Sequence, residues 1–136
     1  MNRLLSRRMS SRHLLYLFRR APHGTLYGWE MLQSVLVGAA FEQQVSLAFV
    51  EDGVYQLVRG SDTSATSSKN FMPVYQVLAD YGVDQVYVDQ AALTARGLNR
   101  QSLWRVTDEE TGRDLLTLCD TEQLQTLLAT ADVVFS

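Results

Sequence analysis

Short, continuous apolar runs alternate along this chain with stretches in which apolar residues recur every three or four positions. The runs are 13–19 (HLLYLFR), 45–50 (VSLAFV), 85–88 (QVYV) and 115–119 (LLTLC). Runs of this length are typical of strands that are buried on both faces of a parallel sheet. A last short strand is expected at 133–135.

In the segments between these runs, apolar residues recur at the spacing of an α-helix. Apolar residues of 26–42 form one stripe, and Thr25 is placed to cap that helix. Further helices are expected at 71–81, at 91–96 and after Asp120, where Asp120 with Gln123 three residues later resembles a capping box. We therefore expect an α/β fold in three layers, a mostly parallel sheet of about five strands with helices on both faces, as in flavodoxin-like domains.

In two stretches the apolar residues show no clear helical or strand period. Residues 59–69 are rich in Ser, Thr and Gly, which indicates a loop. Residues 98–113 are ambiguous, with a strand at 103–106 as one interpretation.

The charge distribution separates a tail from a body. Residues 1–20 hold six Arg and no acidic residue, whereas 21–136 hold six basic residues and all fifteen acidic ones. We expect a disordered basic tail at 1–12 and a single domain at 13–136, with translation starting at Met1 or Met9. An acidic body disfavours direct binding of nucleic acid. No secretory signal or membrane span is recognisable, so we expect a cytoplasmic protein.

The small numbers of cysteine and histidine residues exclude several classes of site. One Cys and two His among 136 residues exclude a disulfide framework and a Cys-based zinc finger. We expect neither a metal nor a cofactor.

Two strand-to-helix connections are candidate binding sites, since ligands of open α/β sheets lie beyond the carboxyl ends of the strands. The first holds Pro22, His23, Gly24 and Thr25, and the second holds Asp52 and Gly53. Ordinary structural turns are the favoured interpretation of both segments, and ligand contact is the alternative.

Cys119 ends a buried run and is the one candidate nucleophile. A reactive thiol needs access and a lowered pKa, whereas a free Cys is often a core residue. Both interpretations stay open, with core packing favoured.

Several segments resemble the DsrE/DsrF-like sulfur-relay family over about residues 13–136. They are 21–25 (APHGT), 29–30 (WE), 38–41 (GAAF), 52–57 (DGVYQL) and 95–98 (ARGL). Within that family the chain is similar to the DsrF/TusC branch. The resemblance implies a heterohexamer with DsrE/TusD-like and DsrH/TusB-like subunits, and a downstream protein that accepts sulfur from the complex.

In this family sulfur travels as a cysteine persulfide, and the carrying cysteine lies directly after the third strand. Asp89 occupies that position here, and a carboxylate cannot carry a persulfide. The resemblance therefore implies a structural or regulatory subunit that carries no sulfur, in intracellular sulfur oxidation or, alternatively, in thiolation of the tRNA wobble uridine. Two other hypotheses are a stand-alone domain that binds a small molecule and a thiol enzyme that uses Cys119.

Overall fold

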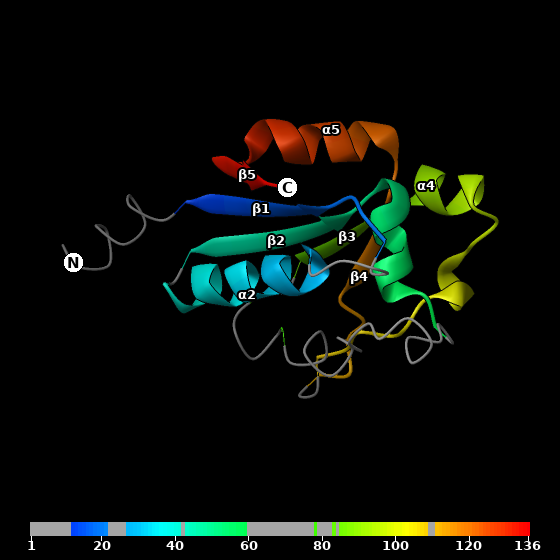
Figure 1. Cartoon of the computed structure of the whole chain (residues 1–136), viewed down its shortest axis with the longest axis horizontal. Coiled ribbons are helices and arrows are strands. Elements are labelled where there is room, and N and C mark those ends of the chain that lie inside the picture. Colours follow the sequence, from blue (N-terminus) through cyan, green and yellow to red (C-terminus); the bar gives the residue numbers. More distant parts are fainter. Residues whose placement is uncertain are drawn as a thin grey trace.

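The computed structural model describes residues 12–21, 27–41, 43–59, 78, 83, 85–108 and 111–136. Strands and helices alternate along them (Figure 1). The elements are β1 (His13–Phe18), α2 (Tyr27–Ala40), β2 (Gln44–Phe49), the 3₁₀ helix η1 (Glu51–Leu57), β3 (Gln85–Asp89), α4 (Gln90–Ala95), the 3₁₀ helix η3 (Arg100–Ser102), β4 (Leu116–Cys119), α5 (Thr121–Thr130) and β5 (Val133–Phe135). None of the helices in the described ranges combines the length and the apolar character needed to cross a membrane.

The five strands form one sheet in the order β4-β3-β2-β1-β5, and every neighbouring pair is parallel. The predicted α/β fold with a parallel five-stranded sheet is confirmed. Parallel strands bring all carboxyl ends to the same end of the sheet, which is where the predicted site residues follow β2, β3 and β4.

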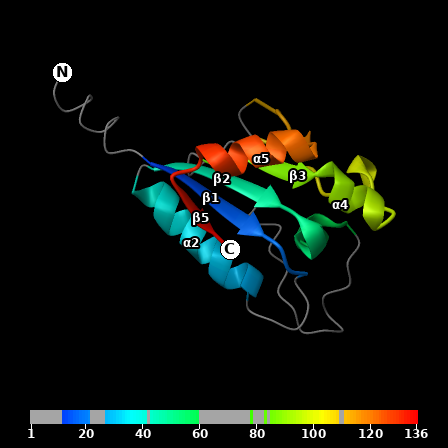
Figure 2. The ribbon, with the colours of Figure 1, turned by 90° about the horizontal axis from the view of Figure 1, so that it is seen from above.

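One face of the sheet carries the main apolar core. The side chains of Tyr16, Leu47 and Val88 share this face through the strand register, and all are buried. Helix α2 packs against it, and the Tyr16 hydroxyl donates a hydrogen bond to the Ser34 carbonyl at 2.9 Å. In Figure 2, α2 and α5 lie on opposite sides of the sheet, as the three-layer prediction requires.

The face toward α5 is less apolar. Leu15, Ser46 and Ala48 lie on it and are buried. The capping box between Asp120 and Gln123 is present, with both hydrogen bonds formed. Helix α5 nevertheless has no fully buried residue, and Leu128 keeps 36% of its surface exposed. The amphipathic pattern predicted this helix, but its stripe packs more loosely than that of α2.

One predicted strand is absent from the structure, and several other predictions concern residues that the structure does not describe. Residues 103–106 form no strand; Leu103 instead makes an isolated antiparallel bridge to Val58. The reason is that 103–108 hydrogen-bonds to two separate segments, 57–59 and 113–115, so it continues no ladder. Residues 1–11, Thr25, the loop from 60 to 69 and the helix expected at 71–81, apart from Leu78, lie outside the described residues.

Candidate functional site

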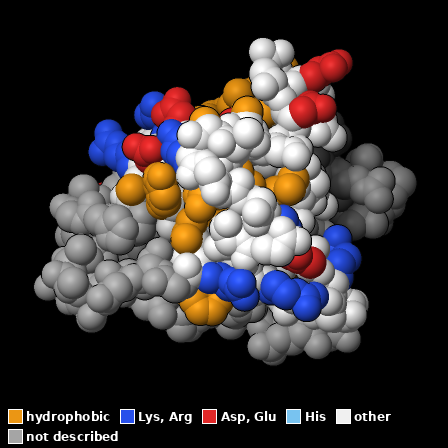
Figure 3. Space-filling view, turned by 90° about the vertical axis from the view of Figure 1, so that its right-hand side faces the viewer, with side chains coloured by type: hydrophobic (Ala, Val, Ile, Leu, Met, Phe, Trp, Pro, Cys, Tyr) orange, Lys and Arg blue, Asp and Glu red, His pale blue; other side chains and the backbone are white. Residues whose placement is uncertain are grey.

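The end of the molecule at which the strands terminate brings together short connections from β2, β3 and β4. Figure 3 views the molecule from this side and shows most of the acidic side chains in its upper part, with basic ones both at its upper left and along its lower part. Pro22, His23, Gly24 and Thr25, which follow β1, lie outside the described residues. Ligand contact by those four residues stays a prediction.

Gly53 lies where η1 passes directly over the end of β1. A Cβ atom at this position would overlap the Phe18 carbonyl oxygen and would stand 2.9 Å from the Arg19 nitrogen. The same carbonyl accepts a hydrogen bond from the Val50 backbone at 2.9 Å, so the sheet holds it in place. Close backbone approach therefore accounts for glycine here.

Asp52 is exposed and holds α4 against η1. Its Oδ1 accepts hydrogen bonds from Arg96 Nε at 3.0 Å and Nη2 at 2.9 Å. Arg96 also donates from Nη1 to the Ala92 carbonyl at 3.1 Å, which stabilises the last turn of α4. A carboxylate engaged in this way already has a structural role, and its predicted role in binding is untested.

Asp89 ends β3 and caps α4. Its side chain accepts a hydrogen bond from the Ala91 backbone N–H at 3.1 Å, which satisfies one of the free N–H groups of the first turn. The carboxylate therefore has a local structural reason to be there.

Cys119 ends β4 beside Asp89 and is 2% exposed. Burial raises the pKa of its thiol, and the negative charges of Asp89 and Asp120 raise this pKa further. Because the thiolate is the nucleophilic form, all three causes make this sulfur less reactive. The geometry favours core packing over sulfur chemistry for Cys119.

Gln56 is a buried polar residue of η1 that sequence reasoning did not single out. Its Nε2 donates to the Arg20 carbonyl at 3.2 Å, which ties η1 to the chain after β1. Its Oε1 is buried and accepts no hydrogen bond from the described residues. A buried acceptor without a donor costs free energy.

The candidate groups in the described ranges already have structural roles. Within the described ranges no three His, Cys, Asp or Glu side chains are placed to hold a metal ion. The candidate carboxylates cap a helix or form an ion pair, and the thiol is buried. The ion pair of Asp52 with Arg96 joins the connection after β2 to the connection after β3.

Sequence reasoning missed a second group of functional candidates, the arginines 59, 100 and 105. They line one cavity together with Gln101, Leu103 and Asp114. Their wide separation in sequence, and the absence of periodicity in 98–113, left no pattern that could join them.

Comparisons with known proteins point to one family. The family model "DsrE/DsrF-like family" matches residues 12–136. The intracellular sulfur oxidation protein DsrF of Allochromatium vinosum is 44% identical over 127 residues, covering 90% of this chain and 93% of its own length. The protein TusC homolog of Vibrio vulnificus is 38% identical over 90 residues, covering 66% of this chain and 76% of its own length.

A solved structure shares the fold. The ychN protein from E. coli superposes with a TM-score of 0.71 at 17% identity, covering 91% of this chain and 97% of that chain. At this identity the likeness concerns the architecture alone.

Proposed function

This chain belongs to the DsrE/DsrF-like family, and from that premise we propose that it is a subunit of a sulfur-relay complex that carries no sulfur itself and serves intracellular sulfur oxidation. Its contribution is to assemble with the sulfur-carrying chain and to shape the surface of the complex. The proposal agrees with the name of the A. vinosum relative.

The observation that carries the proposal is the pair formed by Asp89 and Cys119. In the family resemblance, Asp89 stands at the position of the carrier cysteine, and its carboxylate caps α4. The chain's one cysteine is buried and its thiol pKa is raised. A persulfide carrier needs an accessible sulfur that ionises readily, and this chain offers none.

Exposed apolar side chains support assembly with other subunits. Val37 is 57% exposed, Phe41 73% and Phe135 39%. A groove of about 420 Å³ between α2 and β5 is lined by Tyr16, Val37, Gly38 and Phe135, with Gln33 and Ser34. Apolar groups clustered beside an edge strand mark an interaction surface. We take the occupant to be another subunit of the complex, either the DsrE/TusD-like or the DsrH/TusB-like chain of a heterohexamer.

The assembly is tested by co-expression of the three chains, which should elute as one complex on size exclusion. The carrier assignment is tested by loading this complex with a persulfide donor and weighing each chain separately. The sulfur should appear on the DsrE/TusD-like chain and be absent from this one. A stable addition of one sulfur to this chain, lost in the Cys119→Ala variant, would overturn the assignment. A chain that stays monomeric beside both partners would favour a stand-alone binding domain.

Thiolation of the tRNA wobble uridine is the second candidate, since the TusC homolog is also similar. Oxidation is favoured because the A. vinosum relative matches 90% of this chain, against 66% for the TusC homolog. Deleting the gene separates the two. Loss of growth on reduced sulfur compounds with normal 2-thiouridine in tRNA supports oxidation, and the reverse supports thiolation.

A further inference from the structure

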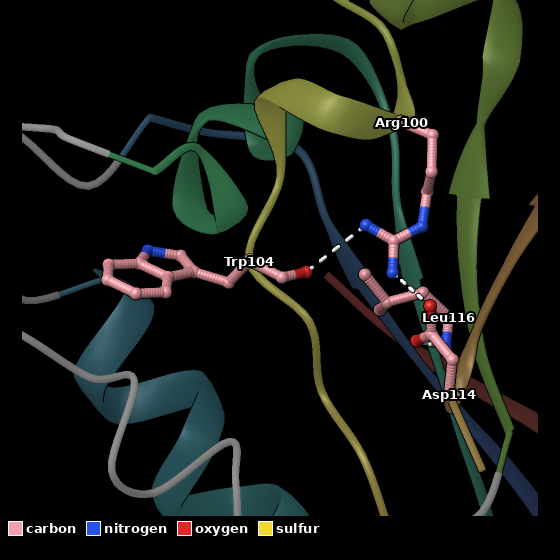
Figure 4. A network of polar contacts seen from close by, with 4 residues as sticks. All are labelled: Arg100, Trp104, Asp114 and Leu116. Carbon is pink, nitrogen blue, oxygen red and sulfur yellow. Dashed lines mark hydrogen bonds and ion pairs between the residues drawn. The ribbon is translucent and has the colours of Figure 1, made fainter. Parts of the chain in front are cut away.

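Among the described residues, Glu30 has no arginine partner, whereas Asp52 and Asp114 each have one. Figure 4 shows the pair that Asp114 forms with Arg100. Glu30 is exposed in the first turn of α2, and its carboxylate forms no ion pair within the part of the chain that the structure describes. Water hydrates this carboxylate in the isolated chain, so the missing partner has a cost only where another molecule covers Glu30.

Glu30 lies at one end of a depression that runs along α2. Five residues line a hollow of about 270 Å³, namely Glu30, Met31, Ser34, Phe135 and Ser136. The hollow shares Ser34 and Phe135 with the groove of about 420 Å³ described above, which reaches Gly38. Since an α-helix rises about 1.5 Å per residue, Glu30 and Gly38 are about 12 Å apart along the helix axis. We call the hollow and the groove together the α2 groove, which is acidic at one end and apolar at the other.

The floor of the α2 groove is fixed by contacts within the chain. Tyr16 and Phe135 stack with ring centroids 4.7 Å apart and ring planes 12° from parallel, and the pairing of β1 with β5 holds them side by side. The Tyr16 hydroxyl donates to the Ser34 carbonyl at 2.9 Å. Gly38 leaves room for Tyr16, because a Cβ atom there would stand 2.9 Å from the hydroxyl oxygen. A surface that is ordered in advance loses less entropy when it binds a partner.

Charged residues are scarce on the two elements that border the α2 groove. Helix α2 and strand β5 comprise 17 residues, and Glu30 is the one charged residue among them, whereas 26 of the other 119 residues are charged. Depletion of charge is the compositional signature of an interface core. Glu30 is also the one charged residue in the lining of the α2 groove; Arg19 donates to Ser136 Oγ at 3.3 Å but is not part of that lining.

A subunit that covers the α2 groove would remove water from Glu30. A buried carboxylate without a cationic partner is strongly destabilising, and no basic residue of the described ranges lines the α2 groove. The cation therefore has to come from the covering subunit. On the basis of the proposed function, we propose that the occupant is a segment of a partner subunit with an arginine or lysine for Glu30 and an apolar side chain for the Gly38 end. An extended segment spans the distance between them in about four residues.

The helix dipole gives Glu30 a second role, which the experiment has to separate from recognition. An acidic side chain in the first turn stabilises a helix through the dipole. That effect acts in the isolated chain, whereas pairing with a partner's cation acts only in the complex. Stability of the isolated chain and dissociation of the complex therefore report the two roles separately.

Binding kinetics of Glu30 variants with the DsrE/TusD-like and DsrH/TusB-like chains test the proposal. The full-length chain is immobilised, and association and dissociation of the two partner chains are followed. Affinity should fall at least about tenfold in Glu30→Gln, mainly through faster dissociation, because a buried pair is broken. It should fall at least about a hundredfold in Glu30→Arg, since two like charges would then meet.

Glu122→Gln is the matched control, because Glu122 is likewise exposed in the first turn of a helix. That helix, α5, lies on the opposite side of the sheet from α2 (Figure 2). The complex of Glu122→Gln should dissociate at the parent rate. Urea unfolding of the isolated Glu30→Gln and Glu122→Gln chains should give closely similar midpoints, which excludes a folding defect as the cause of weaker binding.

The outcomes separate this proposal from the proposed function. A parent chain that binds neither partner contradicts both. A parent chain that assembles, together with Glu30→Gln and Glu30→Arg complexes that dissociate at the parent rate, leaves the proposed function intact and overturns the pairing of Glu30 with a partner's cation. Self-association of the isolated chain that is lost in Val37→Glu would assign the α2 groove to a second copy of this chain and would also overturn it.

Discussion

Asp89 and Cys119 stand opposite each other in the parallel pairing of β3 with β4. The carboxylate caps α4 while its negative charge raises the pKa of the neighbouring thiol. The position that the family resemblance assigns to the carrier cysteine and the chain's one thiol are therefore adjacent, and the carboxylate at the first position makes the thiol at the second less reactive. This relationship can be tested on the isolated protein.

Replacing Asp89 by Asn should make Cys119 more reactive. Asn caps a helix as well as Asp does, so α4 keeps its hydrogen bond while one negative charge is lost. The thiol pKa should fall toward its ordinary value, and alkylation at pH 8 should become about threefold faster. Burial, the largest cause of the raised pKa, persists, so the thiol should still react far more slowly than in urea.

Glu30→Gln serves as the control for that experiment, because Glu30 is exposed on α2 and that helix packs on the other face of the sheet. Its alkylation rate should match the parent rate. A native thiol that already reacts as fast as the unfolded chain would contradict the buried assignment of Cys119.

Alkaline pH should destabilise the fold through the same thiol. The folded-state pKa of Cys119 is raised, so the folded chain holds this proton more tightly than the unfolded chain does. The resulting stability is fully present below about pH 8.5 and is lost as the pH rises toward the folded-state pKa, by at most about 1.4 kcal/mol per pH unit. Tyr16 adds a similar loss from about pH 10, since burial raises its pKa too.

Urea unfolding under reducing conditions at pH 7, 8.5 and 9.5 measures this loss. Cys119→Ala should be less stable than the parent at pH 7 by about 1 kcal/mol, as for a small core truncation. Its stability should then vary less with pH over this range. Parallel pH profiles for the two proteins would count against the raised thiol pKa.

Val37→Glu should impair assembly without unfolding the chain. Val37 is 57% exposed on α2, so a charge there costs the isolated chain less than about 0.5 kcal/mol. Buried in an interface it would be an unpaired charge, and we expect the complex to weaken at least about tenfold. Size exclusion with the two partner chains measures this. Gln125→Glu, at an exposed position of α5, should assemble normally; equal assembly of both variants would exclude this groove as the interface.

The layers of this fold follow from patterns that act locally. The short apolar runs predicted β1, β2, β3 and β4 nearly at their observed bounds. The capping box of Asp120 predicted where α5 begins. Whether the apolar stripe of a helix becomes fully buried depends on the face of the sheet against which the helix packs. The face of the sheet toward α5 includes Ser46 and Ala48, which are small, and the leucines of α5 stay partly exposed.

The arginine cavity shows where sequence patterns fail. Arg59 reaches residues 100–105 through single bridges and loop hydrogen bonds, and such contacts have no period. Gly53 shows a subtler limit. Its position after a strand indicated a turn or a binding loop, but the reason for glycine is the carbonyl of Phe18, which only the packing of η1 over β1 brings near.

Gly53→Ala should be among the most damaging single substitutions in this fold. The added methyl group would overlap the Phe18 carbonyl, which cannot retreat because it accepts the Val50 N–H and belongs to a strand paired on both sides. Since η1 must move away, the Gly53 hydrogen bond to the Val50 carbonyl at 2.8 Å should be lost as well. We expect a loss of more than about 3 kcal/mol in the free energy of unfolding, beyond ordinary overpacking.

Gly112→Ala is the control: its φ of 73° disfavours alanine, but the space around it is open, so a loss of about 1 kcal/mol is expected. Urea unfolding of the two variants measures the difference. Equal losses would mean that backbone conformation, rather than contact with β1, requires glycine at position 53.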